Sequence, residues 1–263
     1  MKITIIGAGN MGGAIALGLA GGSVVPAENI TVTARTEATL AKISSKNEII
    51  HTSVSNTEAV KGADIVFLAI KPWQLADVVA EIKPYIDYSN CAVASVVAGI
   101  TFKEISEMFD NGDGKCPLLY RVIPNTGVSL GKSVTFISEN GATKEQCDFL
   151  KTIFNELGIT IFVTEQMLVA GTSLASCGIA FALKFLDSSI KAGVSDGFSE
   201  DEAREIVLQT MSGAIELLKT NETMPQTEID KVTTPGGLTL KGLSAMSENG
   251  FENAVLQGVK MSR

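Results

Sequence analysis

A glycine-rich turn near the start of the chain is the feature that most constrains the fold. The residues Gly7-Ala8-Gly9-Asn10-Met11-Gly12 follow the apolar run Ile3–Ile6 and open a helical pattern over Asn10–Ala20. In this context the first glycine permits a tight turn, the second lets the backbone approach a pyrophosphate, and the third allows close packing of helix on strand. The N–H groups at the helix start attract phosphate. The sequence therefore predicts that all six residues bind a dinucleotide cofactor.

Apolar runs alternate with amphipathic stretches through the first part of the chain, as is typical of a doubly wound parallel sheet. After Glu165 no strand pattern remains and helical periodicity follows. We therefore predict an α/β protein with an N-terminal Rossmann-like domain in residues 1–164 and an all-α C-terminal dimerisation domain in residues 165–263. The expected strands are 3–6, 30–34, 49–50, 64–70, 91–97, 118–123, 134–137 and 160–163. The expected helices are 10–20, 37–45, 58–61, 72–83, 144–157, 166–192, 199–219, 226–231, 239–248 and 252–261.

The helix expected over Met167–Ile190 is apolar on nearly every side in its first half. Such a helix must be covered on all faces, so we predict a homodimer in which it packs against its mate; the alternative is a single-chain bundle that closes over it. The segment Gln166–Leu183 carries no charge and reaches the length threshold of a membrane span. Its Gly, Ser and Thr residues and its lack of basic flanks favour a buried helix of a soluble protein.

Charge and residue counts exclude several function classes. The formal net charge is −8 and no Lys or Arg cluster stands out, so nucleic acid is expected to be repelled. The cysteines Cys91, Cys116, Cys147 and Cys177 lie far apart, which indicates reduced thiols in a cytoplasmic protein. A zinc site needs clustered ligands, and the sole histidine is His51, so no metal is expected. The apolar run at the N-terminus is too short for a signal peptide.

Two further segments refine the cofactor site. The second strand ends at Arg35-Thr36, where an NAD-specific site usually has an acidic residue for the ribose hydroxyls. A guanidinium suits a 2′-phosphate, so we expect NADP(H) to be preferred and NAD(H) to be possible; the alternative is a surface arginine. The run Ala69-Ile70-Lys71-Pro72 follows the fourth strand at the carboxyl edge of the sheet, where it is expected to flank the nicotinamide ribose.

The residue inventory favours reduction of a C=N bond. Hydride addition to a ketone leaves an alkoxide that needs a proton donor, whereas addition to a protonated imine gives a neutral amine directly. His51 cannot serve as an acid in the C-terminal half, although Lys71 could act as one. The stretch Val232–Leu243 contains Thr234-Pro235-Gly236-Gly237 before an apolar helix, which predicts a carboxylate receptor made of backbone N–H groups. The alternative is ordinary helix capping and a tight turn.

Several motifs now stand in a recognisable order. They are the glycine turn at 7–12, Ala69-Ile70-Lys71-Pro72, Val97-Ala98-Gly99-Ile100, Pro124-Asn125-Thr126 and Thr234-Pro235-Gly236-Gly237-Leu238-Thr239. With these motifs the chain resembles the pyrroline-5-carboxylate reductase family over essentially its whole length. The Pro-Gly-Gly-x-Thr stretch is the specific motif, since the glycine turn alone fits many dehydrogenases.

The resemblance implies that NAD(P)H delivers hydride to the imine carbon of 1-pyrroline-5-carboxylate, giving L-proline, in the last step of proline biosynthesis. It implies an interlocked homodimer, often assembled into a decamer, with each active site built from both subunits. It places Thr239 near the ring nitrogen as the catalytic candidate, Asn56 on the adenosine ribose, and Glu222 near a family glutamate at the substrate site. The implied cofactor-facing residues also include Val96, Val97 and Ala98, and the implied substrate-binding residues are Glu222, Thr234, Gly236, Gly237, Leu238 and Thr239.

The chain departs from the family pattern at a few positions. The family usually carries Ser-Gly-Ser-Gly-Pro-Ala-Tyr where this chain has Ala175–Phe181, and the missing proline should straighten or reshape the helix there. Gly127 replaces a proline, and Leu238 and Lys241 replace smaller residues. These departures leave two alternatives open: a non-catalytic or regulatory NADP-binding paralogue, and a reductase of the hydroxyisobutyrate or phosphogluconate dehydrogenase type.

Overall fold

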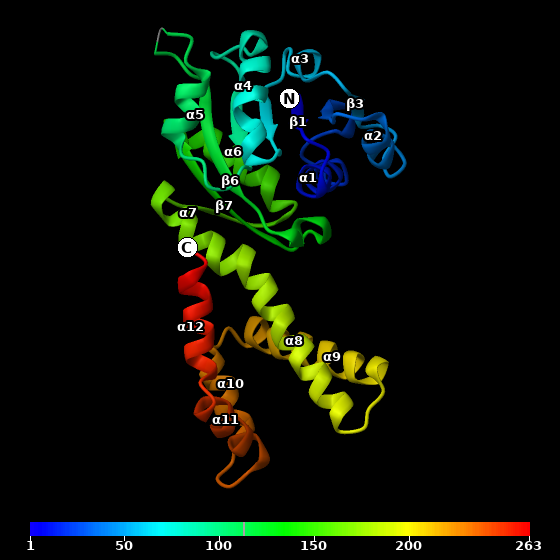
Figure 1. The fold of residues 1–263 in the computed structure, drawn as a ribbon, viewed down its shortest axis with the longest axis vertical. Coiled ribbons are helices and arrows are strands. Elements are labelled where there is room, and N and C mark those ends of the chain that lie inside the picture. Colours follow the sequence, from blue (N-terminus) through cyan, green and yellow to red (C-terminus); the bar gives the residue numbers. More distant parts are fainter. Residues whose placement is uncertain (113) are drawn as a thin grey trace. The chain divides into compact units, whose positions relative to one another are not determined.

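The computed structural model describes residues 1–112 and 114–263, and its first part is built on one twisted sheet (Figure 1). Among the described residues the strand order is β3-β2-β1-β4-β5-β6-β7-β8. Neighbouring strands run parallel except for β6 and β7, which are antiparallel. The chain order turns back between β1 and β4, which is where open α/β sheets bind ligands. The strands are β1 (Ile3–Ile6), β2 (Ile30–Thr33), β3 (His51–Ser53), β4 (Ile65–Leu68), β5 (Ala92–Ser95), β6 (Leu118–Ile123), β7 (Ser133–Asn140) and β8 (Gly158–Phe162).

Helices cover both faces of this sheet, so the central strands are apolar on both sides. On one face α1 and α6 pack against residues such as Ile5 and Phe67, and the Phe67 and Phe154 rings meet edge to face at 5.7 Å. On the other face α4 and α5 pack against residues such as Val66 and Leu68. The helices of this part are α1 (Asn10–Ala20), α2 (Glu37–Ser44), α3 (Asn56–Ala59), α4 (Leu75–Ile82), α5 (Phe102–Phe109), α6 (Lys144–Asn155) and α7 (Glu165–Gly171).

The predicted Rossmann-like fold is confirmed, with three local differences. The third strand is His51–Ser53 rather than residues 49–50, because the ladder with β2 begins at His51 while Ile50 packs into the core just before it. The sequence analysis did not name α5, although its apolar residues Phe102, Ile105 and Phe109 share one buried face. The connection from β6 to β7 is too short for a crossover, so that pair is antiparallel.

The chain forms two compact units, Met1–Ser176 and Cys177–Arg263. Helix α7 belongs to the first unit, where Gly171 lies directly against the Phe136 ring of β7. The domain boundary before Glu165 stays a prediction. The second unit is entirely helical in its described residues and contains α8 (Gly178–Ser195), α9 (Glu200–Asn221), α10 (Pro225–Val232), α11 (Leu238–Glu248) and α12 (Phe251–Met261).

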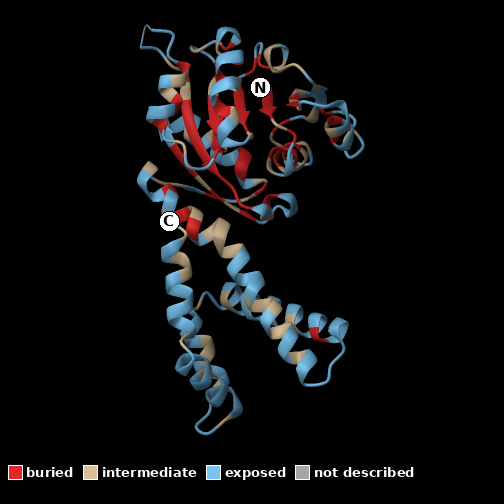
Figure 2. Cartoon of the chain, viewed as in Figure 1, coloured by how far each residue is buried: buried red, intermediate tan, exposed pale blue. Residues whose placement is uncertain are grey.

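The long apolar helix is a continuous helical run over Glu165–Ser195, interrupted by a π-helical turn at Thr172–Cys177. By length and composition it could cross a membrane, and 17% of its apolar window is buried. Within the second unit α8 has no buried residue, and Ala203 of α9 is the one buried residue among α8–α12 (Figure 2). The alternative of a single-chain bundle that closes over this helix is therefore wrong for the described residues, because one chain leaves α8 uncovered.

Candidate active site

The glycine turn has the geometry that a pyrophosphate-binding loop requires. Gly7 has φ +106°, a left-handed conformation, and a Cβ there would lie 2.5 Å from the Ala69 carbonyl oxygen. A Cβ on Gly12 would lie 2.0 Å from the Gly7 carbonyl oxygen, so both positions exclude any side chain. At Gly9, by contrast, a Cβ would meet nothing within 4 Å. The loop is thus tight where it packs on the sheet and open where a ligand would approach.

The start of α1 is suited to an anion. Gly9 is its N-cap, and in the described chain this helix has neither a side-chain cap nor an acidic residue in its first turn. The first N–H groups of a helix have no intrahelical acceptor and carry the positive end of the helix dipole. Gly9 and Asn10 are exposed. These residues therefore fit the diphosphate of a dinucleotide.

The structure brings two other predicted segments to the same edge of the sheet. The Ala69 N–H donates to the Ile6 carbonyl at 2.9 Å, which holds the start of Ala69–Pro72 beside the glycine turn. The Val96 N–H donates to the Leu68 carbonyl at 3.0 Å, which places Val96–Ala98 next to it. Three loops that follow β1, β4 and β5 thus meet at the carboxyl edge. Lys71 is exposed, and its N–H is held by Gln74 Oε1 at 3.2 Å.

The predicted adenosine side lies beyond β2 and β3. The Ala34 N–H donates to the Ser53 carbonyl at 3.3 Å, which brings the Arg35 and Asn56 segments together. Arg35 is exposed, and the hydroxyls of Thr36 and Thr39 lie 3.0 Å apart. Asn56 is the first residue of α3, and its amide Nδ2 donates to Glu81 Oε2 at 3.0 Å. The amide of Asn56 is therefore held in a fixed orientation, and the backbone bond between Ala34 and Ser53 links its segment to that of the exposed Arg35.

The predicted substrate loop lies in the second unit and ends at a helix start. The Gly237 N–H donates to the Thr234 carbonyl at 2.9 Å, and Gly236 adopts φ +75°, so the loop is a tight turn. Gly237 is the N-cap of α11, which in the described chain has no side-chain cap and no acidic residue in its first turn. Thr239 follows in that first turn, and the Leu238 side chain is 86% exposed. This arrangement can accept a carboxylate.

Glu222, which precedes that loop in the sequence, has a strained backbone conformation. It ends α9 with φ +50°, and it is the one non-glycine residue with positive φ in the described chain. Such strain persists only where the surroundings hold it. Its neighbours Asn221 and Thr223 both donate to Glu228 Oε1, at 3.1 and 2.6 Å. Lys231 Nζ binds the same oxygen at 2.7 Å, and these donors, Lys231 foremost, lower the pKa of Glu228 to about 2.

The chain matches known reductases over both units. Residues 165–263 match the family described as pyrroline-5-carboxylate reductase dimerisation, and residues 2–99 match NADP oxidoreductase, coenzyme F420-dependent. The pyrroline-5-carboxylate reductase of Aquifex aeolicus is 31% identical, with 98% of this chain and 93% of that protein aligned. The chain belongs to the pyrroline-5-carboxylate reductase family.

Two other members of the pyrroline-5-carboxylate reductase family extend this comparison. Pyrroline-5-carboxylate reductase 1 of Dictyostelium discoideum is 33% identical over 99% of this chain, which spans 48% of that longer protein. The crystal structure of Plasmodium falciparum pyrroline carboxylate reductase with NADP bound superposes with a TM-score of 0.87 at 28% identity, covering 100% of this chain and 95% of that one.

The π-helical turn falls where this reductase departs from its family pattern. Two hydrogen bonds tie it to the Pro124-Asn125-Thr126 motif: Asn125 Nδ2 donates to the Ala175 carbonyl at 3.3 Å, and the Ser176 hydroxyl donates to the Pro124 carbonyl at 3.4 Å. Asn125 Oδ1 also accepts from the Gly127 N–H at 2.9 Å. Because the motif follows β6 directly, this turn lies at the carboxyl edge of the sheet. Single π turns inside helices are frequent at functional sites.

Two of the four cysteines of this reductase have a raised thiol pKa. All four are free thiols. Burial raises the pKa of Cys91 to about 12, and it also raises the pKa of Cys147, so both thiols resist ionisation. No group of three or more His, Cys, Asp or Glu side chains among the described residues could hold a metal ion.

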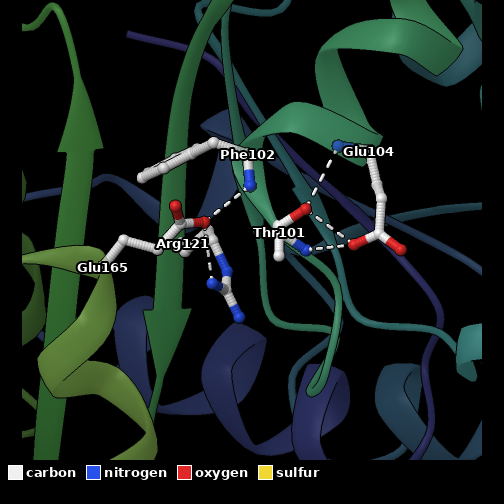
Figure 3. Close-up of polar contacts among 5 residues, drawn as sticks. All are labelled: Thr101, Phe102, Glu104, Arg121 and Glu165. Atoms are coloured by element: carbon white, nitrogen blue, oxygen red, sulfur yellow. Dashed lines mark hydrogen bonds and ion pairs between the residues drawn. The ribbon is translucent and has the colours of Figure 1, made fainter.

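Sequence reasoning missed one polar pair close to the predicted cofactor loops. Arg121 in β6 is buried, and its Nη1 lies 2.9 Å from Glu165 Oε1 (Figure 3). The signal was present, because a lone arginine inside an otherwise apolar strand must find a partner. The partner is 44 residues away in the chain, and nothing local identifies it.

Proposed function

We propose that this chain reduces 1-pyrroline-5-carboxylate to L-proline, with NADPH as the preferred coenzyme and NADH as an accepted one. The observation that carries the proposal is the alignment with pyrroline-5-carboxylate reductases over both units. The alternative of a hydroxyisobutyrate-type reductase is not favoured, because the helical part itself matches the dimerisation family of these reductases. A regulatory paralogue is not favoured either, since the glycine turn and the Thr234–Thr239 motif are both retained.

The first unit supplies the coenzyme contacts in this proposal. The backbone of Gly7–Gly12 and the N-terminus of α1 hold the diphosphate, and Asn56 holds the adenosine ribose. Ala69–Pro72 and Val96–Ala98 flank the nicotinamide end. The open space at Gly9 and the uncapped start of α1 support these assignments.

The 2′-phosphate of NADPH is assigned to Arg35 and Thr36. A guanidinium recognises a phosphate through several N–H groups and gains little from a neutral hydroxyl. Arg35 is exposed at the tip of β2, and the residue pair that follows β2 includes no carboxylate. These features support a preference for NADPH.

The second unit supplies the substrate contacts. The backbone N–H groups of Thr234–Thr239 hold the carboxylate, with Glu222 nearby, and the Thr239 hydroxyl bonds to the ring nitrogen. A bound reduced nicotinamide supplies the hydride for the imine carbon. The remaining work of the protein is positioning, which favours a reaction that needs little acid–base help. The uncapped N-terminus of α11 and the strained φ of Glu222 support these roles.

Assembly and location complete the proposal. The dimerisation family of residues 165–263 supports a homodimer, and we extend it to active sites that contain residues of both subunits and to a decamer in the cytoplasm. The apolar side chains that α8 and α12 expose, including Leu183, Val255 and Leu256, support a subunit interface on these helices.

A single assay tests the proposed function. Purified protein is mixed with pyrroline-5-carboxylate and NADPH, and oxidation of the coenzyme is followed by its nicotinamide absorbance. Rapid oxidation that forms one proline for each NADPH consumed supports the proposal. Tight NADPH binding without turnover on this or any other cyclic imine would overturn it in favour of the non-catalytic paralogue. Analytical ultracentrifugation of the same sample separates monomer, dimer and decamer.

A further inference from the structure

We propose that the buried Arg121–Glu165 ion pair is the positioning device for the loop Val96–Thr101, and thereby for the nicotinamide end of the coenzyme. The inference deepens the proposed function and rests on its assignment of Val96–Ala98 to the coenzyme. Neither residue touches substrate or coenzyme in this proposal. They act through the backbone of the loop.

Arg121 is held where its charge can be satisfied in few ways. It pairs in register with Ser95, the last residue of β5, so it stands beside the point where the loop begins. The residue is 6% exposed, and its Nε is buried without a partner among the described atoms. An arginine buried to this degree needs a counter-charge. Glu165 Oε1 provides it at 2.9 Å.

Glu165 Oε1 also accepts a second hydrogen bond, from a backbone N–H group. It accepts the Phe102 N–H at 2.6 Å (Figure 3). Phe102 is the first residue of α5, and its N–H is one of those that a helix leaves without an intrahelical acceptor. Glu165 therefore caps α5 from a distant part of the chain, while Arg121 fixes the position of Glu165.

The start of α5 is consequently fastened twice. Thr101 and Glu104 form a reciprocal capping box, in which Glu104 Oε2 accepts the Thr101 N–H at 2.7 Å and the Thr101 hydroxyl oxygen accepts the Glu104 N–H at 3.2 Å. That box orders the helix turn within itself but does not connect it to the sheet. The bond from Phe102 to Glu165, and from there to Arg121, makes this connection.

The other end of the loop is fastened by the sheet. The Val96 N–H bonds the Leu68 carbonyl, and the Val97 N–H donates to the Ser95 hydroxyl at 3.3 Å. Between the two ends lies Gly99 with φ +78° and no neighbour within 4 Å of a Cβ built there, so packing does not hold this residue, whereas Val97 and Ile100 on either side of it pack against the core. A loop of this kind keeps its shape only if both ends are held. Releasing Glu165 frees the downstream end.

The buried ion pair adds little to the free energy of unfolding, because desolvation of the two charges offsets much of their attraction. The pair does provide a fixed geometry between a strand, a helix start and the first residue of α7. Misplacement of a reacting group by about 1 Å can lower a rate on the order of a hundredfold. The proposal therefore predicts a larger effect on hydride transfer than on coenzyme binding.

The test compares Glu165→Ala, Arg121→Met and the conservative Glu165→Gln with a matched control, Glu107→Gln. Glu107 lies on the same helix α5 and forms an exposed pair with Lys103 at 3.8 Å. Three quantities are measured in the full-length protein: kcat with NADPH, the inhibition constant of 2′,5′-ADP, which has no nicotinamide, and the hydrogen–deuterium exchange rate of peptides covering residues 96–102.

We expect Glu165→Ala and Arg121→Met to lower kcat about tenfold or more while the 2′,5′-ADP constant stays within about twofold. Exchange over residues 96–102 should rise in both variants. Glu165→Gln keeps an oxygen for the Phe102 N–H but removes the counter-charge of Arg121, so its kcat should lie between those of Glu165→Ala and the wild type. Glu107→Gln should leave all three quantities unchanged. The proposal would be overturned if hydrogen–deuterium exchange did not change in Glu165→Ala, or if the binding of 2′,5′-ADP weakened as much as kcat fell.

The exchange measurement needs no turnover, so it separates the two proposals. If the wild-type protein fails to oxidise NADPH, the proposed function fails, yet faster exchange in Glu165→Ala still supports the positioning role. If the wild-type protein is active and exchange does not change, the positioning role fails alone.

Discussion

The Thr33 hydroxyl donates a 2.6 Å hydrogen bond to Asn56 Oδ1, and Thr33 is buried at the end of β2 while Asn56 is half-buried. Because Glu81 binds the Nδ2 end of the same amide, the two partners prevent the carboxamide from flipping. One hydrogen of Nδ2 and one lone pair of Oδ1 remain for a ribose.

We therefore expect Thr33→Val, which removes the hydroxyl and keeps the shape, to raise the KM for NADPH and NADH about fivefold each. The value of kcat should stay unchanged, because the nicotinamide end is untouched. Steady-state kinetics with both coenzymes checks this, with Thr31→Val of the same strand as control. An effect on NADPH alone would contradict the assignment of Asn56 to the ribose.

Arg35→Ala tests how the coenzyme is chosen. Loss of the guanidinium should weaken NADPH at least about tenfold and NADH by less than about twofold, because a charged contact to the 2′-phosphate is absent in NADH. The ratio of the two kcat/KM values is the measurement. Equal losses for both coenzymes would mean that Arg35 does not recognise the 2′-phosphate.

Thr239→Ala tests the substrate side. If the hydroxyl bonds to the reacting nitrogen, kcat/KM for pyrroline-5-carboxylate should fall about tenfold or more. The conservative Thr239→Ser keeps the hydroxyl and should recover most of the activity. Kinetics of Thr239→Ala equal to wild type would remove this side chain from the mechanism.

Glu228 gives the second unit a predictable pH response. Its pKa in the folded chain, about 2, lies below the 4.5 of an unperturbed glutamate. Its ionised form therefore stabilises the folded state above pH 4.5, and this contribution is lost as the pH falls from 4.5 towards 2. Thermal midpoints by circular dichroism over this range should depend less steeply on pH in Glu228→Gln than in wild type.

The control for the pH experiment is Glu216→Gln, which removes an exposed pair with Lys219. Parallel pH curves for wild type and Glu228→Gln would show that the bonds from Asn221, Thr223 and Lys231 do not determine the response. Because glutamine keeps an oxygen that can accept from Asn221 and Thr223, the variant that releases both neighbours of Glu222 is Glu228→Ala, and it should also lower kcat/KM.

Glu156 fastens the end of α1 to the end of α6. Its Oε1 accepts the Ser23 N–H, the Ser23 hydroxyl and the Val24 N–H. Glu156→Ala leaves these donors without that acceptor, so the free energy of unfolding should fall by about 1–3 kcal/mol. Urea denaturation measures it, with Lys151→Ala, an exposed residue on α6, as control. Equal midpoints in both variants would contradict the role of these bonds.

Features with local causes could be predicted from the sequence. The glycine turn needs its glycines because of contacts made within a few residues and with the neighbouring strand, so its sequence pattern was sufficient. The buried strands and the all-helical second part followed from apolar periodicity. The predicted coenzyme loops meet at one edge, because the carboxyl ends of parallel strands always do.

Features with distant causes could not be predicted. Arg121 and Glu165 come into contact only after β6 and α7 have packed. The three hydrogen bonds that Glu228 accepts, from Asn221, Thr223 and Lys231, depend on the turn between α9 and α10. The strain at Glu222 has no sequence signature, since glutamate rarely adopts positive φ. The position of β3 was decided by pairing with β2 and not by its own apolar residues.

The exposure of α8 in a single chain has a consequence for how the protein assembles. The second unit, Cys177–Arg263, contains one buried residue and therefore almost no core of its own. Its helices gain their packing from a second subunit. Maturation then becomes second order in chain concentration. Dilute samples should lose specific activity with time, because subunits dissociate. A cell that makes few copies should accumulate unassembled subunits, which proteases degrade first.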